Sequence, residues 1–205
     1  MISEWSGNES ALDQAVRALE KGGLVVLPTD TVYGIGADAF NHDAVARLLA
    51  AKGRGREMPP PVLVGHPGVL DALAATVPQA VRDLIAAFWP GALTIIVQAQ
   101  PSLAWDLGET AGTVAVRMPD HPAALALLRR YGPLAVTSAN LTGQPAAEDC
   151  ATALEYFGTN VAAYVDAGPT PGPTASTIVD ATGPVLRIVR QGVILAEQLR
   201  EVAEL

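Results

Sequence analysis

Apolar residues along this chain alternate between two spacings, which predicts alternating helices and strands. A spacing of three to four residues predicts helices at 10–21, 42–51, 66–75, 78–88, 121–131, 148–157 and 194–202. Short apolar runs between them predict strands, at 24–27, 61–64, 93–98, 113–118, 134–137, 163–166, 176–180 and 185–189. The pattern is that of an α/β fold. The last strands follow one another without long helices, so we expect an open mixed sheet of about seven strands flanked by helices.

The organisation of the chain indicates one domain over residues 1–205. This length is sufficient for a sizeable core, and half of the residues are hydrophobic, which excludes a disordered chain. The longest segment rich in Gly and Pro, GPTPGP at 168–173, is short and lies between two predicted strands. We therefore interpret it as a loop near the functional site and not as a linker between domains.

The charge of the chain is acidic overall but locally basic. A net charge of -8 argues against a general nucleic-acid binder, because such proteins must neutralise phosphates. Between residues 47 and 56, however, there are four cations (Arg47, Lys52, Arg54 and Arg56) and no acid. Such a cluster favours a small anionic ligand such as a nucleotide. Alternatively, these cations complement the dipole at the end of an exposed helix.

Other features bear on location and on metals. No apolar run approaches the roughly 20 residues of a membrane helix, and the first ten residues lack the basic start of a signal peptide. Cys150 is the only cysteine, and the three histidines are far apart in sequence. We expect a cytoplasmic protein that does not act at a membrane, without a disulfide framework and without a metal site built by the protein.

The segment LPTDTVYGIGADA, residues 27–39, follows an apolar strand that Pro28 ends. Four polar side chains then come together: Thr29, Asp30, Thr31 and Tyr33. One interpretation is a strand, a turn and a second strand. The other is the wall of a pocket for a small polar ligand, with glycines that allow the backbone to approach it closely.

Two further segments carry cations that suit an anionic ligand. Lys52 and Arg54 lie in KGRGREM, which we expect to be a Gly-rich loop just after a helix, able to fold around phosphates. In TVAVRMP, strand alternation places Thr113, Ala115 and Arg117 on one face. An arginine in so apolar a strand needs an anion, which could be a ligand or a structural carboxylate.

The last two segments place short polar groups at strand ends. Ser138 and Asn140 follow the strand 134–137, where α/β sheets commonly bind ligands, although both residue types also favour turns. Residues 176–190 read as a hairpin with Ser176 at its start and Arg190 at its end. No nucleophilic motif stands out. These residues are suited to holding phosphates and aligning reactants.

Taken together, these segments resemble the YrdC-like family of L-threonylcarbamoyladenylate synthases, specifically its short, single-domain TsaC-type branch. The motifs fall in the family's order: PTDTVYGIG, KGR, WPGALT, VAVRMP, TSANLTG, STIVD and a final R-x-G at 190–192. The match covers about residues 22–192, followed by the helix at 194–202. The resemblance implies an open twisted sheet with a concave ligand-binding face.

The resemblance also implies a reaction. L-threonine and bicarbonate or CO2 would give N-carboxy-threonine, which attacks the α-phosphate of ATP to form threonylcarbamoyl-AMP and pyrophosphate. Proteins of a threonylcarbamoyl-transferase complex would then modify adenosine 37 of ANN-reading tRNAs. Mg²⁺ would accompany the nucleotide, bound by phosphate oxygens.

By the same resemblance, individual residues acquire roles. Those expected to contact L-threonine are Thr31, Arg117, Ser138 and Ser176. Those expected to hold ATP are Lys52, Arg54, Thr113, Asn140 and Arg190. Lys52 and Arg54 are also expected to be catalytic, because preorganised cations stabilise the charge on the phosphate oxygens.

The chain departs from the family pattern at two places. Met58, followed by Pro59, Pro60 and Pro61, stands where the family often has a polar residue, and residues 146–148 (Ala, Ala, Glu) stand where it usually has a Ser or Thr. We expect Glu148 to cap the following helix, because its charge would repel phosphates. Two alternatives remain open: a non-catalytic double-stranded RNA-binding or ribosome-maturation factor of the same fold, with weak RNA binding, and a divergent carbamoyl-transfer paralogue.

Overall fold

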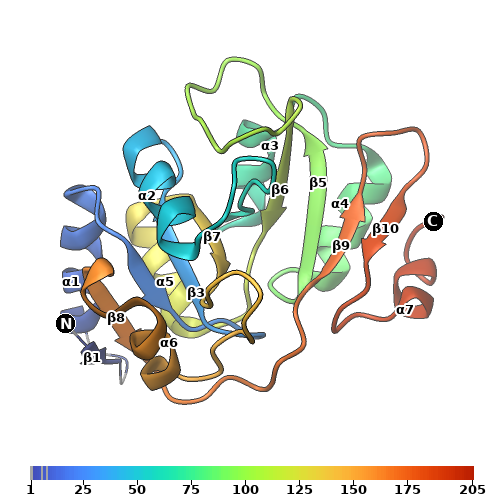
Figure 1. Ribbon diagram of the computed structural model, residues 1–205. Coiled ribbons are helices and arrows are strands. Elements are labelled where there is room, and N and C mark those ends of the chain that lie inside the picture. Colours follow the sequence, from blue (N-terminus) through green and yellow to red (C-terminus); the bar gives the residue numbers. More distant parts are fainter. Residues whose placement is uncertain (1, 6, 8) are drawn as a thin grey trace.

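The computed structural model, which describes residues 2–5, 7 and 9–205, is organised around one mixed, twisted sheet (Figure 1). Within these residues the sheet has ten short strands in the order β1-β8-β2-β3-β7-β4-β6-β5-β9-β10. The strands are β1 (Ile2–Glu4), β2 (Val25–Leu27), β3 (Gly34–Asp38), β4 (Val62–Leu63), β5 (Leu93–Gln98), β6 (Thr113–Arg117), β7 (Leu134–Ser138), β8 (Ala163–Asp166), β9 (Thr177–Asp180) and β10 (Arg187–Arg190). Parallel and antiparallel pairs occur together, so the prediction of a mixed sheet is confirmed.

Helices cover both faces of the sheet. They are α1 (Glu9–Glu20), α2 (His42–Lys52), α3 (Leu70–Leu73), α4 (Gln79–Phe88), α5 (Pro122–Tyr131), α6 (Cys150–Phe157) and α7 (Ala196–Arg200). Helices α1 and α5 share one hydrophobic cluster with Val25, whereas α2, α4 and α6 share the other cluster with Val26. Since neighbouring residues of a strand point to opposite faces, β2 contributes side chains to both cores.

Three elements differ from the sequence-based expectation. Strand β1 was not expected, and it forms because its backbone pairs in parallel with β8, which a polar N-terminal sequence does not reveal. The helix expected at 66–75 is a 3₁₀ turn at Pro67–Val69 followed by the four-residue α3, after which Ala74 bridges to Ala99. Helix α6 is capped by Asp149 and not by Glu148, because the shorter Asp149 carboxylate accepts from the backbone N–H of Thr152 at 2.7 Å.

The short strand β4 opens a space in the middle of the sheet. It pairs with β6 and β7 over only two residues, Val62 and Leu63. The three prolines that precede it, at 59–61, cannot donate ladder hydrogen bonds, so the strand does not extend further back. Strands β6 and β7 both continue past this point, and their ends face each other across the gap that β4 leaves.

In the part of the chain that the structure describes, no helix combines the length and apolar character needed to cross a membrane.

Candidate active site

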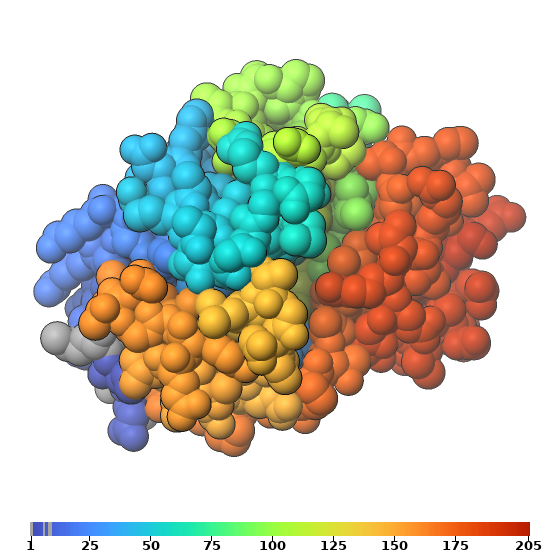
Figure 2. Space-filling view, in the orientation of Figure 1, coloured from blue at the N-terminus to red at the C-terminus, as the bar shows by residue number. Residues whose placement is uncertain are grey.

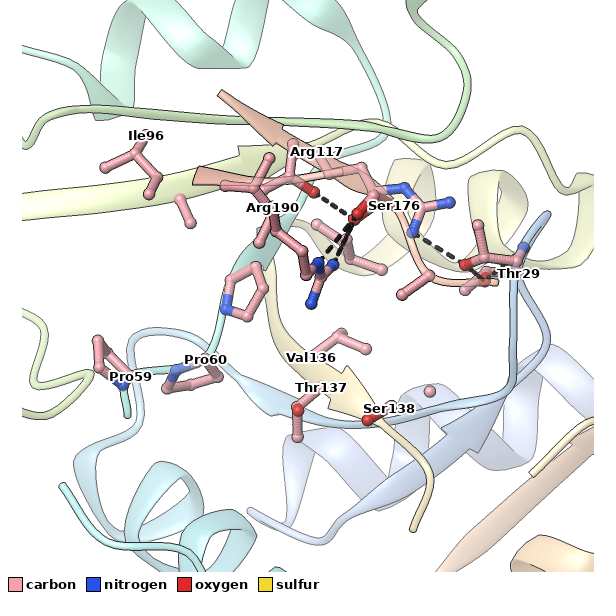
Figure 3. Close-up of a pocket in the computed structure, with 18 of the residues that line it drawn as sticks. Thr29, Pro59, Pro60, Ile96, Arg117, Val136, Thr137, Ser138, Ser176 and Arg190 are labelled. Atoms are coloured by element: carbon pink, nitrogen blue, oxygen red, sulfur yellow. Dashed lines mark hydrogen bonds between the residues drawn. The ribbon is translucent and has the colours of Figure 1, made fainter. Parts of the chain in front are cut away.

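A cavity of about 320 Å³ lies beside the start of β4, between β7 and the strands β5, β6 and β9. Figure 2 shows the molecule hollowed between the orange-red C-terminal hairpin and the teal and yellow segments. Seven of the nine predicted site residues line this cavity: Thr31, Arg54, Thr113, Arg117, Ser138, Ser176 and Arg190. In Figure 3, Thr137 and Ser138 face Ser176 and Arg190 from the opposite wall.

Arg117, at the end of β6, is held by groups of the chain itself. Its Nη2 pairs with the Asp30 carboxylate at 2.6 Å, its Nη1 donates to Thr31 Oγ1 at 3.1 Å, and its Nε donates to the carbonyl of Gly91 at 3.0 Å. The sequence left open whether a ligand or a carboxylate of the chain pairs with Arg117, and the structure shows that Asp30 does so. These bonds use three of the five N–H groups of the guanidinium, and Arg117 still lines the cavity.

The loop from Thr29 to Thr31 is locked around Arg117 by its own hydroxyls. Thr29 Oγ1 donates to the carbonyl of Val32 at 2.6 Å and lies 3.0 Å from Thr31 Oγ1. Both hydroxyls are buried, so each needs such partners to offset the loss of water. The interpretation of residues 27–39 as a strand, a turn and a second strand is confirmed, and the loop before β3 forms part of the cavity wall. That this wall binds a small polar ligand stays a prediction.

Ser176 and Arg190 meet as the predicted hairpin requires. Arg190 donates from Nη2 to the Ser176 carbonyl at 2.8 Å and to its Oγ at 3.1 Å, and from Nε to the same carbonyl at 3.1 Å. Ser176 Oγ also lies 2.8 Å from Thr94 Oγ1. The hairpin thereby fixes one arginine and two hydroxyls at the cavity wall.

Arg54 reaches the cavity from the loop after α2. Its Nη1 donates to Thr137 Oγ1 at 2.8 Å, while its Nε is buried without a hydrogen-bond partner in the described residues. A buried guanidinium nitrogen without a partner is costly, so this position is suited to a ligand that supplies an acceptor.

Three arginines therefore converge on one cavity, and only one of them is neutralised. Among the described residues, Arg117 alone of the three forms an ion pair with a carboxylate. Burial lowers the pKa of each guanidinium from its ordinary value. The charge of Glu57 opposes this shift at Arg54 and that of Asp30 opposes it at Arg117, whereas the charge of Arg190 lowers both pKa values further. Because arginine remains protonated, an anion that enters the cavity would meet three positive charges.

Lys52 and Asn140 are placed differently from the sequence-based expectation. Lys52 is the last residue of α2 and not part of the following loop, and the residue is only 3% exposed. Neither residue is among those lining the cavity. Burial and the nearby charge of Arg54 lower the pKa of Lys52 to about 8. That these two residues hold ATP stays a prediction.

Several lining residues were missed by sequence reasoning. Thr94 and Thr137 lie in two of the motifs that carry the family resemblance, and Pro59, Pro60 and Leu107 contribute apolar walls. A hydroxyl directly before a predicted site residue, as at Thr137, is a signal that could have been used. Leu107 comes from a loop without periodic pattern, so only the tertiary structure identifies it.

Of the two departures from the family pattern, only the prolines at 59–61 line the cavity. Met58 is 39% exposed and is not a lining residue. Ala147 is fully buried and exchanges backbone hydrogen bonds, donating to the carbonyl of Ala139 at 3.0 Å and accepting from the N–H of Tyr33 at 2.9 Å. The carbonyl of Glu148 accepts from the N–H of Thr170 at 2.8 Å, which tethers the 168–173 loop.

Comparison with known proteins identifies one family. Residues 17–192 match the Sua5/YciO/YrdC family model, which carries the description "Telomere recombination". The matched range is most of the chain and contains every residue that we expect at the site.

Individual relatives extend this likeness. The chain is 54% identical over 188 residues to a Mycobacterium tuberculosis H37Rv protein named provisionally as a threonylcarbamoyl-AMP synthase, covering 92% of this chain and 87% of that protein. It is 40% identical to the threonylcarbamoyl-AMP synthase of Bacillus subtilis, covering 98% of this chain but 59% of that protein. The crystal structure of Pyrococcus abyssi Sua5 complexed with L-threonine superposes with a TM-score of 0.93 at 32% identity, covering 98% of this chain and 60% of that chain.

Proposed function

The chain belongs to the Sua5/YciO/YrdC family, and from that premise we propose that it is a threonylcarbamoyl-AMP synthase. This nucleotidyltransferase joins L-threonine, bicarbonate or CO2, and ATP, and releases pyrophosphate. The observation that carries the proposal is the convergence of Arg54, Arg117 and Arg190 on one hydroxyl-lined cavity, two of them without an ion-pair partner among the described residues. We further propose that residues 1–205 act as one domain, which the continuous sheet from β1 to β10 supports.

We propose that L-threonine binds near Arg117. Two N–H groups of Arg117 are not used by Asp30, Thr31 or Gly91, and they can hold the substrate carboxylate. The hydroxyls of Thr31, Ser138 and Ser176 line the same cavity and can fix the orientation of the amino acid. The threonine found in the related Sua5 structure supports a binding site of this kind.

ATP is then placed with its phosphates toward Arg54 and Arg190. Both are cations without an ion-pair partner in the described residues, and Thr113 lines the same cavity. The described residues bring together no group of three or more His, Cys, Asp or Glu, so Mg²⁺ would be held by the phosphate oxygens. When bound, the ion would neutralise part of the phosphate charge.

The chain contributes positioning and electrostatics to the reaction. Threonine and CO2 form a carbamate, one oxygen of which attacks the α-phosphorus while pyrophosphate leaves. Because the carbamate is short-lived, holding it beside the α-phosphate removes most of the entropic barrier. Arg54 and Arg190 are preorganised where negative charge gathers on the phosphate oxygens. Threonylcarbamoyl-transferase proteins would then carry the product's acyl group to tRNA.

Pyrophosphate release from ATP by the purified protein tests this function. With bicarbonate present, we expect release to require L-threonine and to be weaker with L-serine, which lacks the methyl group. Release without threonine, or none under any combination, would contradict the proposal. If no pyrophosphate is released, salt-sensitive binding of double-stranded RNA by the same folded sample would favour the non-catalytic alternative. Turnover of carbamoyl phosphate would favour the carbamoyl-transfer alternative.

A further inference from the structure

The Lys52 ammonium lies against the polypeptide backbone that follows β7. Its Nζ donates to the Ser138 carbonyl at 2.5 Å and to the Asn140 carbonyl at 2.6 Å. A third, longer bond runs to Asn140 Oδ1 at 3.4 Å. An ammonium has three N–H donors, so these oxygens use its full capacity.

The segment from Ser138 to Gln144 is bound to the end of α2 by more than this side chain. The carbonyl of Lys52 accepts from the N–H of Thr142 at 3.0 Å. The Asn140 amide then donates within the same turn, to the carbonyls of Leu141 at 2.8 Å and Gln144 at 2.9 Å. Lys52 is therefore at the centre of a turn whose first residue, Ser138, lines the cavity.

We infer that Lys52 is a positioning residue, which fixes the backbone of Ser138 and Asn140 and thereby places the Ser138 hydroxyl for L-threonine, and does not itself bind phosphate. The inference rests on the proposed synthase function. The inference gives Lys52 a different role from Arg54, which lies only two residues later. The Arg54 guanidinium lines the cavity, and its Nε is buried without a hydrogen-bond partner in the described residues.

Separate binding measurements for each substrate distinguish the two roles of Lys52. Lys52→Met keeps the length of the side chain and removes its donors. At pH 7, below the pKa of about 8, the wild-type ammonium is charged. We expect the Kd for L-threonine, measured by calorimetry without ATP, to rise about tenfold, because charge-assisted hydrogen bonds hold the threonine-binding turn. The Kd for ATP, measured without threonine, should change less than about threefold by the same argument. A residue that bound phosphate would give the reverse, and that result would overturn the inference.

Two further variants control for misfolding of Lys52→Met and for general effects of removing a charge. Lys52→Arg keeps the charge, but its planar fork cannot reach the same three oxygens, so threonine affinity should still fall. Unchanged threonine affinity in Lys52→Arg with weakened ATP binding would overturn the inference. Lys21→Met is the matched control, because Lys21 is the other lysine of the chain and is exposed; both affinities should stay unchanged.

A double-mutant cycle tests whether Lys52 acts through Ser138. Once Ser138→Ala has removed the hydroxyl, adding Lys52→Met should weaken threonine binding by less than it does in the wild type. Full additivity would overturn the inference. Failure of the proposed function is distinguishable from both results, because the wild-type protein would then show neither threonine binding nor threonine-dependent pyrophosphate release.

Discussion

The cavity has two sides that use arginine in different ways. On the paired side, the loop Thr29–Thr31 surrounds Arg117, and Asp30 neutralises it at 2.6 Å. On the open side, Arg54 and Arg190 donate to hydroxyls and a carbonyl, with no carboxylate partner among the described residues. A charge neutralised within the chain contributes to folding as well as to binding, whereas a charge without a partner gains most of its interaction energy when an anionic ligand arrives.

The largest expected effect is on the paired side. Arg117→Met should lower the free energy of unfolding by about 3 kcal/mol, because it leaves the Asp30 carboxylate partly buried without its partner. Urea denaturation measures this loss. The same substitution should abolish most threonine-dependent activity.

Two variants sharpen the interpretation of that result. Arg130→Met removes the ion pair with Asp13, whose side chains are 43% and 35% exposed, and should cost less than about 1 kcal/mol. Arg117→Met combined with Asp30→Leu should recover part of the lost stability, because no buried charge is then left alone. A loss below 1 kcal/mol in Arg117→Met itself would mean that the two sides of the cavity do not differ as described.

On the open side, Arg190→Met should affect activity much more than stability. We expect kcat/KM for ATP to fall by an amount equivalent to about 2 kcal/mol, because a phosphate loses its cation, while the free energy of unfolding changes by less than about 1 kcal/mol. Steady-state pyrophosphate assays and urea denaturation measure the two quantities. Arg187→Met is the control, since Arg187 is exposed and pairs with Asp180 in the same hairpin. Equal loss of ATP turnover in both variants would argue for a general charge effect.

A smaller effect is expected at Thr137, the hydroxyl that orients Arg54. Thr137→Val removes the acceptor that lies 2.8 Å from Arg54 Nη1 and keeps the shape of the side chain. ATP affinity should fall by about 1 kcal/mol, since Arg54 must then be ordered by the ligand alone. Calorimetric titration with ATP tests this, and unchanged affinity would show that Arg54 needs no support from β7.

The smallest effect concerns His121, which caps α5 beside the paired side. Its Nδ1 accepts from the N–H of Ala123 at 3.2 Å, which requires a neutral ring at that nitrogen. Burial lowers the pKa of His121 from its ordinary value, although Asp30 and Asp120 oppose the shift. Neutral His121 therefore contributes stability in full above about pH 6.5, and this contribution is lost as the pH falls through the lowered folded-state pKa.

The pH dependence of unfolding measures this contribution. We expect about 1 kcal/mol or less from His121 between pH 7 and the lowered pKa. His121→Asn keeps a capping side chain that does not titrate. The unfolding free energy of this variant should therefore depend less steeply on pH below pH 7 than that of the wild type. If the unfolding free energy depends on pH equally in both proteins, His121 does not contribute to that dependence.

Much of the fold followed from local patterns. The mixed sheet, the helix α2 and the meeting of Ser176 with Arg190 were predicted from periodicity and from a hairpin signal. Alternation along β6 also placed Thr113 and Arg117 together on the cavity wall. These predictions succeeded because each depends on residues that are close together in the sequence.

Other features depend on contacts between distant segments, which only the tertiary structure decides. The pairing of Arg117 with Asp30 joins residues 87 positions apart, and the bond from Lys52 to Asn140 joins residues 88 positions apart. The sequence determined which charged and hydroxyl side chains the protein possesses. Whether a charge is neutralised by the chain or left for a ligand was decided by packing, because a buried cation takes the nearest acceptor that the folded backbone brings to it.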